Sequence, residues 1–214
     1  MKQLFFLLSL VILGVTTKAD GDTAGYQISS WTDLSLYQVF KIKQGPKFPI
    51  IWFSHESGKY FLESRLNFDW NGTAAIIAGK TFQKKDGFWI TPKAGLFFGF
   101  ADGGYNGLTF EANFGGKRKH LKYFTMNQVA VSFQKKNPAF FYQYTDIGYD
   151  AEYIFISGSF QFYQEMRKDA EPFFDIGPQV MVPIKKFYTK FWYTIDPHPK
   201  HLLSKITLGL GYGF

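Results

Sequence analysis

The chain has 214 residues, the usual size of a single domain, and it contains no cysteine. The lack of cysteine excludes a disulfide framework and a lipid-modified N-terminal cysteine. The formal net charge is +7, but the basic residues gather in predicted turns and no basic helix is predicted, so nucleic-acid binding is not expected. Aromatic residues make up 21% of the chain, which is more than a soluble core of this size requires.

The N-terminus has the layout of a secretory signal peptide. Met1, Lys2 and Gln3 form a short positive region, and a 12-residue apolar run follows at 4–15. Thr17 and Ala19 then offer small residues for cleavage. The apolar run is too short to span a bilayer, which takes about 20 helical residues. We therefore predict a cleaved signal peptide at 1–19 and a mature domain at 20–214, with 22 basic and 17 acidic residues and a net charge of +5.

The mature chain is predicted to consist of β-strands. It has no second apolar stretch of 18 residues, which excludes a helical membrane protein, and no helical periodicity of useful length. Period-two segments separated by turn residues are predicted instead, with ten clear ones and two weaker ones that would make twelve. The clear segments are 58–70, 73–83, 88–100, 106–114, 119–134, 139–147, 151–163, 173–183, 187–194 and 203–214, and the weaker ones are about 33–42 and 48–54.

Most of these segments have one apolar, aromatic face and one polar or small face. In 106–114, for example, Leu108 and Phe110 alternate with Thr109 and Glu111. The segments 119–134 and 139–147 are mixed, and their faces stay unassigned. The apolar face is bulkier than a small barrel interior can hold, which favours a membrane barrel with that face outside. The fold class is thus all-β: a single antiparallel up-and-down transmembrane β-barrel of 10–12 strands.

The polar face supplies candidates for residues that line the lumen. These are Glu63, Arg65, Asn67, Asp69, Lys80, Lys93, Glu111, Asn113, Asp175 and Gln179. Two roles are open for them. They could form a salt-bridged plug that lets a narrow barrel bury polar groups, or a lining that selects small polar solutes.

Local signals predict particular features of the strands. Asn71-Gly72 is typical of a tight type I′ hairpin, which would place Trp70 opposite Thr73, Leu66 opposite Ile77 and Glu63 opposite Lys80. The turn also accounts for the glycosylation-type sequence that begins at Asn71. Pro92 and Pro178 fall inside predicted strands, where each would lose a ladder hydrogen bond, so we expect a bulge or a strand end at each.

The chain ends in a strand whose large residues are Leu208, Leu210, Tyr212 and Phe214. This ending resembles the C-terminal assembly signal of Gram-negative outer-membrane β-barrel proteins. The resemblance implies that the last strand closes the barrel against the first, and that the barrel-assembly machinery reads the terminal aromatic residue. It also implies an outer-membrane location after signal cleavage, with both termini in the periplasm. The turns at 84–87, 115–118, 148–150 and 184–186 would be periplasmic, and the connections at 101–105, 135–138, 164–172 and 195–202 would be outer loops.

No catalytic, nucleotide-binding or metal-binding motif is recognisable. His198 and His201 lie in a proline-containing segment without acidic neighbours, and His55 and His120 are isolated. We expect no enzyme activity, no cofactor and no metal, with outer-membrane lipid, the assembly machinery and a small polar solute as partners. The predicted function is a narrow pore or uptake channel for small polar solutes. The alternative is a closed-lumen barrel that acts as a structural or partner-binding element through its outer loops at 164–172 and 195–202.

Overall fold

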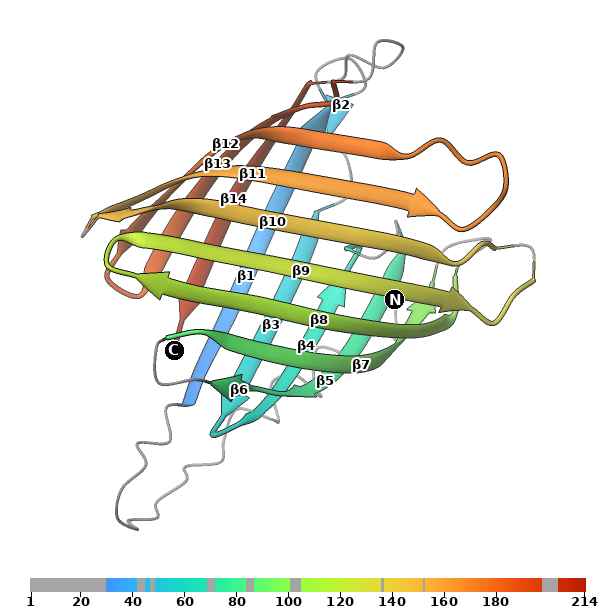
Figure 1. Cartoon of the computed structure of the whole chain (residues 1–214), viewed down its shortest axis with the longest axis horizontal. Helices are drawn as coiled ribbons and strands as arrows, with labels where there is room; N and C mark the ends of the chain where they lie inside the picture. The colour runs from blue at the N-terminus through green and yellow to red at the C-terminus, as the bar shows by residue number, and fades with distance from the viewer. Residues whose placement is uncertain are drawn as a thin grey trace.

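The computed structural model describes most of the chain after residue 29, and shows it as one barrel (Figure 1). The described residues are 30–41, 45–46, 49–68, 72–83, 87–100, 105–135, 137–151, 153–197 and 204–214. The predicted signal peptide therefore lies outside the described residues, as do Asp69, Asn71, His198 and His201.

The described residues form a closed barrel of twelve long antiparallel strands, within the predicted range of 10–12, with two short pieces, β2 and β6, beside them. The long strands follow one another around the barrel in chain order. They are β1 (Ser30–Lys41), β3 (Ile50–Ser57), β4 (Tyr60–Leu66), β5 (Thr73–Lys80), β7 (Trp89–Gly99), β8 (Gly107–Arg118), β9 (Leu121–Ser132), β10 (Phe140–Ala151), β11 (Ile154–Glu165), β12 (Phe173–Ile184), β13 (Phe187–Ile195) and β14 (Ser204–Gly213). The short pieces are β2 (Gly45–Pro46) and β6 (Phe82–Gln83).

The last strand closes the barrel against the first. β1 and β14 pair continuously from Asp33 opposite Gly213 to Lys41 opposite Lys205. The backbone N–H of Phe214 then donates to the carbonyl of Thr32 at 2.9 Å. Because β14 pairs with β1, the long strands of the described part form a closed sheet, which is how a β-barrel avoids free edges in a membrane.

The alternation of residue types sets the two faces as predicted. In β8, Phe110 is 51% exposed while its neighbour Thr109 is 0% exposed, and Leu108 is also exposed. Ile176, Leu208 and Leu210 are likewise exposed on the outer face, while Asp175 and Gln179 are buried inside. A soluble barrel would have the reverse pattern, so the arrangement is that of a membrane barrel. Among the described residues, none form a helix long and apolar enough to cross a membrane.

The connections fall into two groups at the two ends of the barrel. We call the end where β1 begins and β14 finishes the terminal end, and the opposite end the loop end. Short turns at 58–59, 119–120 and 185–186 lie at the terminal end, where Lys119 and Lys185 have positive φ angles of 55° and 58°. The turn at 185–186 agrees with the prediction. The predictions of turns at 115–118 and 148–150 are wrong, because β8 continues to Arg118 and β10 to Ala151.

The predicted register of the β4–β5 hairpin is wrong. Leu66 lies opposite Ala74 and Glu63 opposite Ile77, whereas Lys80 lies opposite Tyr60. The cause is that β4 ends early, at Leu66, and that the next residue, Asn67, has a left-handed φ of 59°. The Asn67 N–H donates to the Thr73 carbonyl at 2.8 Å, so the connection is longer than the two residues of a tight turn.

The two prolines interrupt the ladder without shifting the register. At Pro178, pairing with β13 lapses between Ile176 and Gln179 and resumes in the same register, so the expected bulge or strand end is absent. Opposite Pro92, the partner strand is interrupted. β5 ends at Lys80, and β6 resumes pairing with β7 in the same register at Phe82. The pairing lost beside each proline is local, two residue pairs at each site, and the barrel stays continuous.

Candidate functional site

The structure places most of the predicted lumen residues on the inner face, but at different depths. Seven are 1–7% exposed, namely Glu63, Arg65, Lys93, Glu111, Asn113, Asp175 and Gln179. Asn67 instead lies in the β4–β5 connection, where its side-chain NH2 donates to the Pro49 carbonyl at 2.9 Å. Lys80 has the outward parity of Ile76 and lies at the terminal-end rim, with Nζ 5.5 Å from the Phe82 ring. Asp69 lies outside the described residues.

Four of these side chains form a closed ionic cluster, which we call the ion quartet: Glu63, Arg65, Lys93 and Glu111. The Arg65 guanidinium binds Glu111 in a bidentate manner at 2.6 and 2.7 Å and also donates to Glu63. Lys93 Nζ lies 3.0 Å from Glu63 and 2.9 Å from Glu111. Two acids and two bases thus neutralise one another, with each side chain at most 1% exposed.

Aromatic rings cover the ion quartet on its lumen side. The Arg65 guanidinium lies 4.2 Å from the centroid of Trp52 and 4.7 Å from that of Phe68. Lys93 Nζ lies 4.9 Å from the centroid of Phe61. Ring faces attract cations, so these contacts add to the ion pairs and keep water from the cluster.

An apolar cluster fills the neighbouring part of the lumen, along β5 to β11. Ile77, Phe97 and Phe140 are at most 3% exposed, and Tyr105 folds onto them from the β7–β8 connection. Burial raises the pKa of the Tyr105 phenol above its ordinary value, and the nearby Glu165 carboxylate raises it further. The remaining members are Ala75 and Ala130, with Tyr142 and Tyr163 packed against them. This part of the interior is therefore a packed core.

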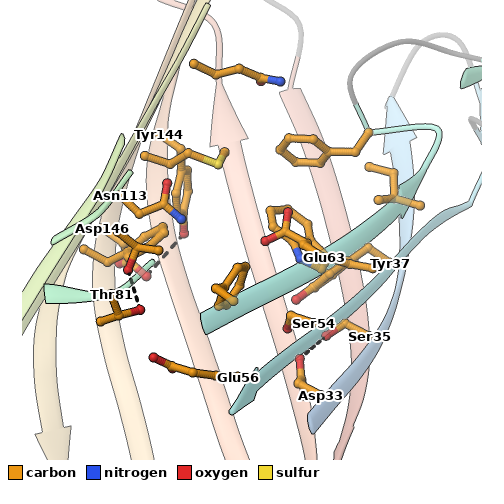
Figure 2. Close-up of a pocket in the computed structure, with 18 of the residues that line it drawn as sticks. Asp33, Ser35, Tyr37, Ser54, Glu56, Glu63, Thr81, Asn113, Tyr144 and Asp146 are labelled. Atoms are coloured by element: carbon orange, nitrogen blue, oxygen red, sulfur yellow. Dashed lines mark hydrogen bonds between the residues drawn. The ribbon is translucent and has the colours of Figure 1, made fainter. Parts of the chain in front are cut away.

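The rest of the interior holds a cavity of about 1860 Å³, whose lining also includes Thr91 of β7, Asn113 of β8 and Met126 of β9. Its lining includes every second residue of β1, from Trp31 through Ser35 and Tyr37 to Lys41, so it extends along the whole of that strand. Figure 2 shows Asp33, Ser35 and Tyr37 from β1 facing Tyr144 and Asp146 across this space. Of the predicted lumen residues, Glu63, Asn113 and Asp175 line the cavity from the inner face, Lys80 borders it at the terminal-end rim, and the others among the described residues do not line it.

Glycines in β14 make room for two tyrosine rings, that of Tyr37, which lines the cavity, and that of Tyr188. A Cβ at Gly211 would lie 2.0 Å from the ring of Tyr188, and one at Gly209 would lie 2.6 Å from that of Tyr37. The rings can therefore lie flat against the strand. The Tyr188 hydroxyl donates to Asp33 at 3.0 Å, and the Ser35 hydroxyl donates to the same carboxylate at 2.7 Å. The alternate glycines before Phe214 thus position part of the lining.

A second polar group lies on β10 and β12. The Gln179 side-chain NH2 donates to Asp146 at 2.8 Å, and the Tyr144 hydroxyl lies 3.1 Å from the Gln179 carbonyl oxygen. Lys190 on β13 completes this wall with its Nζ 5.5–5.7 Å from the ring centroids of Tyr37, Tyr144 and Trp192. Nearer the loop end, Lys205 pairs with Asp175.

The sequence interpretation missed the residues of β9 and β10 that face the lumen, above all Met126, Gln128, Tyr144 and Asp146. The sequences of these strands look mixed because polar residues on the outer face form hydrogen bonds with each other. The hydroxyl oxygens of Thr125 and Thr145 lie 3.0 Å apart across the strand pair. On the inner face, Phe124 and Tyr144 supply aromatic rings. Met126 and Gln128 lie two residues apart in β9 and therefore on the same face of the strand. This spacing is the signal that could have identified the face toward the lumen.

No cluster of three or more His, Cys, Asp or Glu side chains with the arrangement of a metal site occurs in the part of the chain that the structure describes.

Comparison with known proteins gives structural matches. No protein-family model and no curated protein matches the chain. Its structure is similar to that of a KdgM porin, with a TM-score of 0.62 and 11% identity over 85% of this chain and 99% of that chain. A structure described as KdgM porin in complex with disordered oligogalacturonate gives the same values. A NanC porin is similar with a TM-score of 0.60 and 9% identity over 85% of this chain and 98% of that chain. At these identities the similarity shows the fold, which is the outer-membrane β-barrel fold of small porins.

Proposed function

We propose that this protein is a narrow outer-membrane channel for small polar solutes, located in the outer membrane of a Gram-negative bacterium after its signal peptide is cleaved. The observation that carries the proposal is the cavity that follows β1 from Trp31 to Lys41, along the full length of the strand. A plugged barrel would have side chains meeting across this space. The similarity to porin structures, one of them in complex with oligogalacturonate, supports the same class of function.

The charges around the cavity suggest what it would pass. Its lining contains five lysines, namely Lys41, Lys59, Lys80, Lys190 and Lys205, and five acids, namely Asp33, Glu56, Glu63, Asp146 and Asp175. Opposite charges in equal number do not create a strong field of one sign, so weak ion selectivity is expected. Aromatic rings, among them Tyr37, Trp52, Tyr142 and Trp192, lie between the charges. The lining therefore fits uncharged or weakly charged polar solutes.

A second candidate function is a structural or partner-binding barrel with a closed lumen. The ion quartet and the apolar cluster favour it, because they already fill part of the interior beside β4 to β10. Its contact surface would be at the loop end, where Met166 is 53% exposed beside Arg167 and Lys168 in the β11–β12 connection.

The test is the single-channel conductance of the refolded mature protein in a planar lipid bilayer. A shift in gel mobility between unheated and heated samples shows that the barrel is folded before the recording. We expect steady open-channel steps and a reversal potential near zero in a salt gradient. A folded barrel that carries no current would refute the channel and favour the second candidate.

A further inference from the structure

The connection after β4 sends an aromatic side chain into the lumen. Tyr60, Leu62 and Leu66 follow the outward parity of β4, and Phe68 would continue it in a longer strand. The left-handed φ of Asn67 ends the alternation, and Phe68 turns inward instead. Its ring makes an edge contact with Trp52 of β3, at a centroid distance of 4.6 Å, and with Tyr142 of β10, at 5.8 Å.

These two contacts join opposite walls of the barrel. Counted around the closed sheet in either direction, β3 and β10 are six strands apart, which is the largest separation that twelve strands allow. The chain Trp52–Phe68–Tyr142, which we call the aromatic bridge, therefore crosses the lumen. It stands nearer the loop end, because Phe68 follows the loop end of β4.

Near the loop end, the aromatic bridge separates the packed part of the lumen from the cavity. On the packed side, Arg65 of the ion quartet lies 4.7 Å from the Phe68 ring, and Tyr142 packs on the apolar cluster. All three bridge residues also line the cavity. The opposite wall of the cavity at this level is polar and comes from β1 and β11 to β14, with Lys41, Gln161, Asp175, Thr194, Lys205 and Thr207.

We propose that Phe68 is the residue that sets the width of the passage, with the aromatic bridge as the apolar wall of the constriction and the Asp175–Lys205 wall as its polar side. This inference rests on the proposed channel function. Phe68 contacts three side chains, those of Trp52, Tyr142 and Arg65. Each of these residues belongs to a strand of the barrel wall, so its position does not depend on Phe68. Arg65, for example, keeps its bidentate bond to Glu111. Shortening Phe68 should therefore open the bridge and leave the barrel intact.

The experiment compares Phe68→Ala with Phe110→Ala in planar bilayers. Phe110 is the matched control, because it is a phenylalanine that is 51% exposed on the outer face of the same barrel. We expect the Phe68→Ala channel to conduct about twofold or more above wild type, since removing a ring at a constriction widens the path there. It should also admit larger uncharged polyethylene glycols, and Phe68→Trp should lower the conductance. Phe110→Ala should behave as wild type.

The outcomes separate the two proposals. If wild type conducts and neither Phe68 variant differs from it, the role of Phe68 is refuted while the channel stands. If wild type is silent and folded Phe68→Ala conducts, Phe68 controls the passage and the steady channel is refuted. If both are silent although the gel-mobility shift shows folded barrels, both proposals fail.

Discussion

The ion quartet offers the sharpest test of how this barrel is stabilised. Replacing Arg65 by methionine keeps most of the side-chain volume and removes the guanidinium. Glu63 and Glu111 are then left with Lys93 alone, so one buried negative charge has no counter-charge. Breaking a buried ion pair by removing one partner costs about 3–5 kcal/mol, because the remaining charge is neither hydrated nor paired. We expect Arg65→Met to lower the free energy of unfolding by about that amount.

The double variant Arg65→Met with Glu111→Gln restores neutrality. Glu63 and Lys93 then remain as an ion pair at 3.0 Å. The positive charge of Arg65 and the negative charge of Glu111 are removed together. Replacing both members of a buried pair is often far less costly than removing one, so the double variant should be more stable than Arg65→Met alone. The measurement is urea unfolding of the protein refolded into lipid vesicles, followed by tryptophan fluorescence. A double variant as unstable as the sum of its two single variants would refute the view that charge balance holds the cluster.

Two further predictions concern the closing strand. Gly211→Val should prevent Tyr188 from lying flat and lower the folded fraction seen by heat-dependent gel mobility, because a Cβ there would meet the ring at 2.0 Å. Gly158→Val, where a Cβ meets nothing within 4 Å, should fold as wild type, and equal yields for the two variants would contradict the steric reasoning. Phe214→Ala should reduce assembly in cells much more than refolding into detergent, since its backbone bond to Thr32 survives and only the exposed ring is lost. A parallel loss in both preparations would assign Phe214 to barrel stability rather than to recognition.

The strands were predictable because their signal is local. Alternation along β8, β12 and β14 places apolar residues outward, and a membrane on one side and a polar lumen on the other keep the pattern clean. The pattern fails in β9 and β10, where Phe124 and Tyr144 lie inside and Thr125 and Thr145 pair outside. In these two strands the usual arrangement is reversed. Aromatic rings point into the lumen, and a hydrogen-bonded pair of polar side chains lies on the outer face.

The candidate site was less predictable because it depends on contacts between distant strands. The polarity of Arg65 and Glu111 indicates the inner face, but nothing in their separation of 46 residues predicts a bidentate bond. The register of the Asn71-Gly72 hairpin failed for a related reason. A turn motif has a preferred register, yet the bond from Asn67 to Thr73 and the entry of Phe68 into the lumen favour a longer connection.

The division of the lumen changes how its charges should be interpreted. Arg65, Lys93 and Glu111 are buried, paired and absent from the cavity lining, so they hold the wall and do not meet a solute. Among the described residues, the charges that do face the cavity include Lys190, whose Nζ lies among three aromatic rings, and Asp175, which pairs with Lys205. A cation that rests on ring faces is less neutralised than one in a carboxylate pair. The small selectivity that the channel has should therefore depend on Lys190 far more than on the ion quartet, although the quartet is the larger group of charges.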